Sequence, residues 1–230
     1  MGLKESGLRG SLRNVSVGID AIPDRGLIRD YDARSLTGFS NDDSVSTFAD
    51  NQGNEDLSGT GTFKSEGING LPAVESAGDE EYTGDSHNFG ENLEYTLAGV
   101  AQIQTVADGA IQTNGPDERV RLRVVDDGSN FEVDHPGSAD DGKFGNPDTN
   151  PFRYVISFDG STVFADIDGT NLLEEDFGTD DGRANDYSLG GDSGGLEIDI
   201  LLGRHLSYSE FYDADGRSEI DSALKSHYNL

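Results

Sequence analysis

The sequence predicts an all-β protein built as a sandwich of two antiparallel sheets. Many short segments alternate apolar and polar residues, which is the pattern of strands that turn one face to a core. The dipeptide Asp-Gly, which favours tight turns, occurs seven times along the chain. Turn signals at this frequency favour a sandwich over strands that alternate with long helices.

Residues 1–25 differ from the rest of the chain in charge. They contain four basic and three acidic residues, whereas the whole chain has 45 Asp+Glu against 16 Lys+Arg. We interpret them as an N-terminal arm that docks onto a neighbour in an assembly, and residues 26–230 as the domain. A terminus without fixed structure is the alternative. The residues expected to attach the arm are Leu3, Lys4, Leu8, Arg9, Leu12 and Arg13.

The domain is predicted to be a series of short strands. They cover Leu27–Asp32, Pro72–Ser76, Leu93–Ile103, Glu118–Val125, Arg153–Phe158, Ser161–Asp166 and Gly195–Leu202. The third of these strands is expected to be interrupted at Gly99. Residues 40–62 and 134–151 are polar and rich in turn-forming residues, so we expect long loops there.

The alternation is clearest between Glu118 and Val125. Val120, Leu122 and Val124 would face the core, and Arg119, Arg121 and Arg123 would lie on the opposite face. We expect these arginines to form a solvated face paired with carboxylates.

A hairpin is predicted at Asp159-Gly160, between two alternating segments. The dipeptide favours a type I′ turn, in which both central residues have positive φ. The turn would join Arg153–Phe158 to Ser161–Asp166 in one antiparallel pair.

The last residues predict a helix from Ser218 to Tyr228 that lies on the sandwich as a lid. Its start would be capped by Asp215 or Ser218, and Lys225 would lie near its negative end. The positions on one helical face are Ile220, Ala223, Leu224, His227 and Tyr228.

Composition excludes several functions and suggests an environment. A formal net charge of -29 repels phosphates, so nucleic-acid binding is not expected. The apolar runs are too short to insert into a membrane. In salt of about 1 M the Debye length is roughly 3 Å, which screens repulsion between surface carboxylates. We therefore expect a halophilic source, and an acidic surface protein of a mesophile is the alternative.

Four motifs follow one another along the chain. They are Val45–Asp50 with Gln52-Gly53-Asn54, Gly67–Val74, Val163–Gly169, and the tail from Leu206 to Leu230. Together they resemble the motifs of concanavalin A-like/laminin G-like jelly-roll domains. Phe48 stands where that family has Trp, and Tyr208–Gly216 is an insertion before the final helix.

The resemblance implies an antiparallel two-sheet jelly-roll sandwich with an extended N-terminal arm and a C-terminal amphipathic helix. Domains of this family often bind carbohydrate or protein partners through a rim or a concave sheet, frequently with Ca²⁺, and occur on virion surfaces and tail fibres. The arm also resembles short N-terminal anchors in structural proteins of tailed viruses. Taken together with the acidic composition, these resemblances imply an origin in haloarchaea or their viruses.

Three groups of residues are candidate sites. Asp166, Asp168 and Asn171 offer oxygen ligands for Ca²⁺, although Asp-Gly is also ordinary turn chemistry. Tyr208, Phe211 and Tyr212 offer rings that would stack on a sugar, although such rings more often belong to a core or a subunit interface.

The third group would be catalytic in glucanases of this fold, which use Glu-x-Asp-x-x-Glu. Glu197 and Asp199 match, but Leu202 stands at the third position, so no acid is available there to protonate a leaving group. We expect these two carboxylates to be the polar face of a strand and the protein not to be an enzyme.

The sequence thus predicts a structural and adhesive module, such as a capsid turret, decoration or tail-fibre subunit. It would lie on a virion surface or outside the cell in high salt, form homo-oligomers, contact other structural proteins through its arm and bind host-surface glycan. The alternatives are a carbohydrate-binding module of a cell-surface protein and a glycoside hydrolase of glucanase type.

Overall fold

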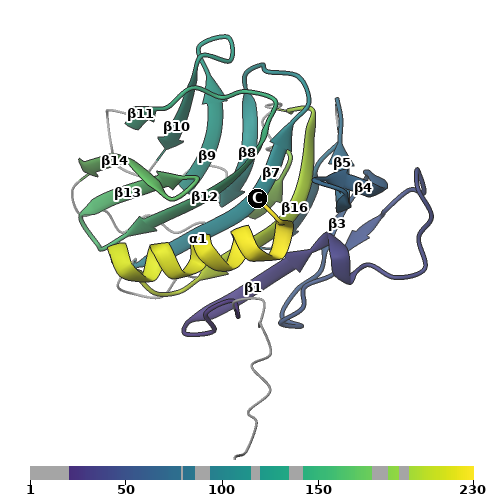
Figure 1. Cartoon of the computed structure of the whole chain (residues 1–230), viewed down its shortest axis with the longest axis horizontal. Helices are drawn as coiled ribbons and strands as arrows, with labels where there is room; N and C mark the ends of the chain where they lie inside the picture. Colours follow the sequence, from purple (N-terminus) through teal and green to yellow (C-terminus); the bar gives the residue numbers. More distant parts are fainter. Residues whose placement is uncertain are drawn as a thin grey trace, which may run out of the picture.

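The structure, a computed structural model, describes residues 21–78, 80–85, 94–114, 120–134, 142–177, 186–191 and 197–230. Over these ranges the chain forms two antiparallel sheets of eight strands each, a 3-10 helix η1 (Ala33–Ser35) and a C-terminal helix (Figure 1). The all-β sandwich and its C-terminal helix are therefore confirmed. Residues 1–20, which include all six expected attachment residues, lie outside the described residues.

One sheet, here called sheet A, contains the long central strands. In spatial order it consists of β14 (Thr170–Asp176), β13 (Thr162–Ile167), β12 (Pro151–Phe158), β7 (Tyr95–Ile103), β16 (Ile200–Tyr208), β5 (Leu71–Ser76) and β4 (Thr62–Ile68). Strand β1 (Leu27–Asp32) also pairs with β16, along the half of that strand that β5 leaves open.

The second sheet, sheet B, lies behind sheet A in Figure 1. In spatial order it consists of β11 (Gly142–Phe144), β10 (Asn130–Asp134), β9 (Val120–Val125), β8 (Gly109–Asn114), β15 (Asp186–Leu189), β6 (Tyr82–Asp85), β3 (Leu57–Gly59) and β2 (Thr47–Phe48). The chain crosses between the sheets at β6–β7 and at β7–β8, so strands close in sequence lie in different layers.

The main core lies between the two sheets and follows the alternation of each strand. In β12, Tyr154 and Ile156 point into this core, while Arg153 and Val155 point to the other side of sheet A. The predicted inward residues of β9, Val120, Leu122 and Val124, are all in the core. Each fully buried aliphatic or aromatic side chain of this kind contributes about 1.5–3 kcal/mol to folding.

The faces of β16 exchange at a bulge between Leu202 and Arg204. Before the bulge Leu202 packs in the main core, and after it Leu206 and Tyr208 pack on the outer face of sheet A. Gly203 occupies the bulge, where an added Cβ would lie 3.0 Å from the ring of Tyr228. The extra residue reverses the alternation, and this is why Tyr208 faces outward under the helix.

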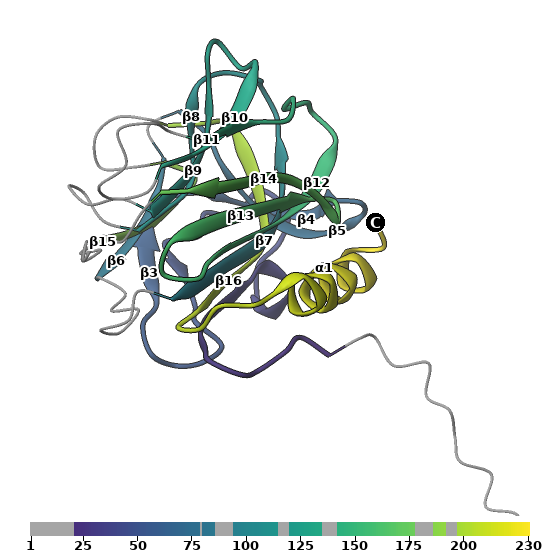
Figure 2. The same ribbon diagram turned by 90° about the vertical axis from the view of Figure 1, so that its left-hand side faces the viewer.

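Helix α1 (Ala214–Tyr228) covers that outer face, as Figure 2 shows. Its buried residues include Ile220, Ala223, Leu224 and Tyr228, which confirms the predicted apolar face and the lid. It begins one turn earlier than predicted, because the carboxylate of Asp213 accepts the N–H of Gly216 and caps the first turn. Within the described residues no helix is long and apolar enough to cross a membrane.

Arginine–aspartate pairs join α1 to sheet A. Arg217 Nε lies 2.9 Å from Asp166 of β13, and Asp221 accepts from Arg153 Nε of β12 at 2.8 Å. All four residues are less than 10% exposed. These buried pairs fix the helix in position, because a charge left without its partner there would be costly.

The predicted hairpin between β12 and β13 forms, but the predicted type I′ turn at Asp159-Gly160 is wrong. Between β12 and β13 only Gly160 has positive φ, and the Asp159 carboxylate accepts the N–H groups of Ser161 and Thr162 instead. The type I′ pattern occurs at Asp168-Gly169, between β13 and β14, where φ is 51° and 75°. A carboxylate that bonds to the following N–H groups competes with the type I′ turn.

Other strand predictions need correction. Gly99 does not interrupt β7, which runs through it. The glycine is needed for close packing, because an added Cβ would lie 2.6 Å from Tyr154 Oη and 2.8 Å from His205 Nδ1. The expected loops contain β2, β3 and β11, and the strand expected at Gly195–Leu202 runs instead from Ile200 to Tyr208. Strands β2, β3 and β11 have only two or three residues each, which is too few for an alternation to be visible.

The arginines of β9 have carboxylate partners, as expected, but they are not solvated. Arg121 is 3% exposed and pairs with Asp134, and Arg123 pairs with Glu132 and Asp134 on the neighbouring strand β10. Glu132 is 2% exposed, and burial raises its pKa to about 7. The outer face of sheet B therefore carries a recessed charge cluster. Arg119 lies outside the described residues.

Candidate binding site

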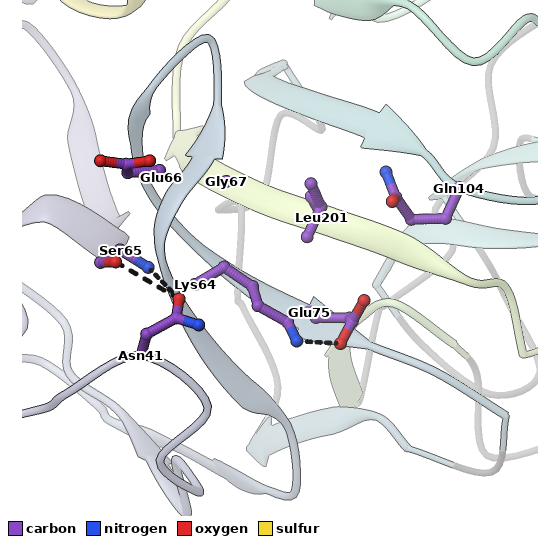
Figure 3. Close-up of a pocket in the computed structure, with 8 residues that line it drawn as sticks. All are labelled: Asn41, Lys64, Ser65, Glu66, Gly67, Glu75, Gln104 and Leu201. Carbon is purple, nitrogen blue, oxygen red and sulfur yellow. Dashed lines mark hydrogen bonds and ion pairs between the residues drawn. The ribbon is translucent and has the colours of Figure 1, made fainter.

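An open groove of about 580 Å³ lies on the outer face of sheet A, at the edge made by β4 and β5. It flanks the C-terminal end of α1, where Asn69 donates to the carbonyls of Tyr228 and Asn229. The lining residues, drawn in Figure 3, are Asn41, Lys64, Ser65, Glu66, Gly67, Glu75, Gln104 and Leu201.

The local sequence of the β4–β5 hairpin produces this groove. Asn69 and Gly70 have φ of 51° and 75°, which is the type I′ turn that closes a two-residue hairpin. The register is irregular between Lys64 and Ile68, so Ser65–Gly67 leave the regular ladder. Gly67 is needed there, since an added Cβ would lie 2.6 Å from the Cβ of Ala73. The bulged segment becomes one wall of the groove.

Two amide side chains complete the walls from distant parts of the chain. The Asn41 side-chain oxygen accepts the N–H of Ser65 at 3.1 Å and its hydroxyl at 3.3 Å, which ties the loop before β2 to the hairpin. Gln104 follows β7, and its backbone N–H donates to the carbonyl of Asp199 at 2.7 Å. Its exposed amide lies across the groove from Asn41 (Figure 3).

The charge of Lys64 is already compensated inside the site. Its ammonium lies 2.8 Å from Asp42 and 2.9 Å from Glu75, and these hydrogen bonds raise its pKa. Glu66 is exposed and makes no hydrogen bond or ion pair with the described part of the chain. Two carboxylates therefore hold one ammonium, Glu66 adds a third carboxylate to the lining, and the groove carries a net negative charge.

This combination of groups suits a hydroxyl-rich ligand. Carboxylate oxygens accept hydrogen bonds, and amides and hydroxyls both donate and accept them. Leu201, 6% exposed, supplies an apolar patch on the floor of the groove. Small-molecule sites commonly combine a concave surface with a few convergent polar groups of this kind.

The three aromatic residues predicted to bind sugar do not form an exposed platform. Tyr208 is fully buried and Tyr212 is 4% exposed, and the two rings pack edge to face at 5.0 Å. Arg25 covers the ring of Tyr212, whose hydroxyl donates to the Arg25 carbonyl. Phe211 is half-buried against Phe164. The correction follows from the bulge in β16 and from α1, which enclose these rings.

Two of the three residues predicted to bind Ca²⁺ are engaged by arginine, and the third, Asn171, donates to one of them. Asp166 pairs with Arg217 and accepts from the Asn171 amide at 2.8 Å, and Asp168 accepts the N–H of Arg153 at 3.0 Å. In the described parts of the chain no group of three or more His, Cys, Asp or Glu residues could hold a metal ion. In the structure these carboxylates act as the sheet's contacts to α1 and as part of a turn.

The glucanase-like carboxylates lie just before β16. Glu197 and Asp199 precede β16, and the Asp199 carboxylate accepts the N–H of Gly78 at 3.0 Å. Leu202, at the position of the third acid, is fully buried in the main core. This stretch does not bring two carboxyl groups and a proton donor to one open surface.

The fold and the edge groove define a β-sandwich of jelly-roll type with an open polar groove on one sheet. No family model and no curated protein matches the chain. Among solved structures it is similar to Trypanosoma rangeli sialidase in complex with the inhibitor DANA, with a TM-score of 0.63 and 12% identity over 87% of this chain and 33% of that chain. It is also similar to the binding domain of Botulinum neurotoxin DC in complex with rat synaptotagmin II, with a TM-score of 0.63 and 8% identity over 86% of this chain and 52% of that chain.

The chain thus spans about a third of the sialidase and about half of the toxin domain. At these identities the likeness shows the sandwich fold, and the groove has to be interpreted from its own residues.

Proposed function

We propose that the chain is a non-enzymatic adhesion module that binds a glycan in the groove between β4, β5 and Gln104. The observation that supports this most directly is the convergence of two amides, a hydroxyl and carboxylates around an apolar floor. Leu202 at the place of a third acid argues against glucanase chemistry. Both solved neighbours come from proteins with binding or glycan-processing names, which is compatible with this role.

We further propose that residues 1–25 attach the module to a larger assembly, as on a virion surface, and that it works in concentrated salt. The arm carries Lys4, Arg9 and Arg13 in a chain of formal net charge -29. Opposite charge would steer the arm towards acidic copies or neighbours, with contact strength set by ionic strength. The alternative, a carbohydrate-binding module of a cell-surface protein, shares the groove but needs no docking arm.

Replacing Gln104 by Ala should weaken glycan binding about tenfold, the equivalent of about 1.4 kcal/mol, because two amide hydrogen bonds to sugar hydroxyls are lost. The measurement is a glycan array in molar salt followed by titration of the best ligand. Gln52→Ala, at an exposed glutamine away from the groove, is the matched control and should bind like the wild type. Equal affinities for both variants would reject the groove as the binding site.

Reversing the arm charges with Lys4→Glu, Arg9→Glu and Arg13→Glu should keep the protein from entering its assembly. A tagged full-length chain would be expressed in the source organism, and the fraction that sediments with released particles would be measured. We expect a severalfold loss for the triple variant and none for Lys225→Glu, which alters an exposed lysine of α1. Undiminished sedimentation of the triple variant would refute the role of the arm.

A further inference from the structure

We propose that the groove selects a glycan carrying a protonated amino group, such as an amino-sugar oligomer, and discriminates against anionic sugars. This inference rests on the proposed function, since it names the ligand class of the same groove. It begins from the balance of charges in the site.

The single cation of the groove is already shared between two carboxylates. Lys64 is the only basic residue in the lining, and its ammonium is held between Asp42 and Glu75 at 2.8 Å and 2.9 Å. A sugar carboxylate or sulfate that binds the third N–H of this ammonium comes close to both carboxylates. The approach of like charges is unfavourable.

A ligand ammonium meets the opposite situation. Glu66 is exposed on the bulged segment, lines the groove and has no partner among the described residues. It is available to form an ion pair that the folded protein does not already contain. The exposed amide of Gln104 remains for the sugar hydroxyls, and the Ser65 hydroxyl, which donates to Asn41, can still accept a hydrogen bond from one of them. Neutral sugars would use only this second set of contacts.

The long-range field of the protein acts in the same direction. A formal net charge of -29 attracts cationic ligands and repels anionic ones when salt is low. At about 1 M salt the Debye length is roughly 3 Å, so only the contact with Glu66 still distinguishes the ligands. Affinity for an amino-sugar should therefore fall as salt is raised, affinity for a uronic acid should rise, and affinity for a neutral sugar should change little.

The test uses three oligosaccharides of equal length that are cationic, neutral and anionic: glucosamine oligomers, N-acetylglucosamine oligomers and glucuronic acid oligomers. Binding to the full chain is titrated by calorimetry in dilute and in molar salt. We expect the order amine, neutral, acid in dilute salt, with smaller differences between the three affinities at high salt. Equal binding of all three in dilute salt, or preference for the acid, would overturn the proposal.

Variants separate the contact from the general field. Glu66→Gln should weaken binding of the amine about threefold to fivefold, in the range of an exposed ion pair, and leave the neutral oligomer unchanged. Glu174→Gln changes the net charge equally, but its glutamate lies on β14 at the opposite edge of sheet A, so it should affect neither ligand. Equal effects of the two variants on the amine would also contradict the proposal.

Failure of this inference can be told apart from failure of the proposed function. If neutral oligomers bind and Gln104→Ala weakens them, while the amine gains nothing, the groove still binds glycan and only the selectivity is wrong. If no oligomer of any charge binds, and the array of glycans also gives none, the proposed function itself fails.

Discussion

Replacing Asp221 by Asn should lower the free energy of unfolding by about 3 kcal/mol. The Arg153 guanidinium, 6% exposed, would lose the carboxylate that lies 2.8 Å from its Nε. Asp168, whose side chain is about half exposed, would remain at 3.2 Å and offset part of the loss, which places the effect at the lower end of the usual 3–5 kcal/mol or so for a broken buried pair. Chemical denaturation in molar salt measures the change.

The double variant Arg153→Met, Asp221→Leu is the control. It removes both charges together and replaces them with apolar groups of similar length, so it should recover most of the lost stability. A single variant within about 1 kcal/mol of the wild type, or a double variant no more stable than the single one, would show that the pair does not hold α1.

The contributions of Glu132 and His205 to the free energy of unfolding should depend on pH in opposite directions. Burial raises the pKa of Glu132 from 4.5 to about 7 and lowers the pKa of His205 from 6.5 to about 3. Between pH 4.5 and 6.5 the folded state holds a proton on Glu132 that the unfolded state has lost, so this contribution falls as pH rises. Over the same range the unfolded state protonates His205 and the folded state does not, so that contribution rises. Each slope approaches about 1.4 kcal/mol per pH unit, and the two cancel.

Replacing one of the two residues at a time should reveal the pH dependence that the other residue's contribution hides. Relative to the wild type, Glu132→Gln should gain stability as pH rises from 4.5 to 7, and His205→Gln should lose stability as pH rises from 3 to 6.5. The free energy of unfolding at half-unit pH steps gives both curves. The charges that face Glu132 are Arg123, Asp134 and, at 3.8 Å, Lys143. Difference curves that are flat for either variant would refute the corresponding shift.

The regular parts of the fold could be predicted because each strand carries its own periodic signal. Val120, Leu122 and Val124 share a face within six residues, and the helical face from Ile220 to Tyr228 is equally local. The reversal in β16 could not be predicted in this way, because Gly203 acts through the ring of Tyr228, which lies far along the chain. The rings of Tyr208 and Tyr212 were expected outside for the same reason.

The groove could be predicted only in part. Asn69-Gly70 is a recognisable turn signal, and it lies within the motif Gly67–Val74. The hairpin itself therefore has a local signature in the sequence. Its partners do not: Asn41 and Gln104 reach the site from loops whose position depends on the sheet order. Likewise, nothing near Asp166 indicates that Arg217 will neutralise it, since the two meet only when α1 packs on β13.

The position of α1 has a consequence for how the module would present a ligand. Residues 21–25 lie against the first half of the helix, beside Tyr212, Ser218 and Glu219, whereas the β4–β5 turn contacts its last residues. A helix of 15 residues is about 22 Å long at 1.5 Å per residue. With the leading peptide held by a supporting particle, the helix would act as a rigid spacer of about this length between the point of attachment and the β4–β5 turn.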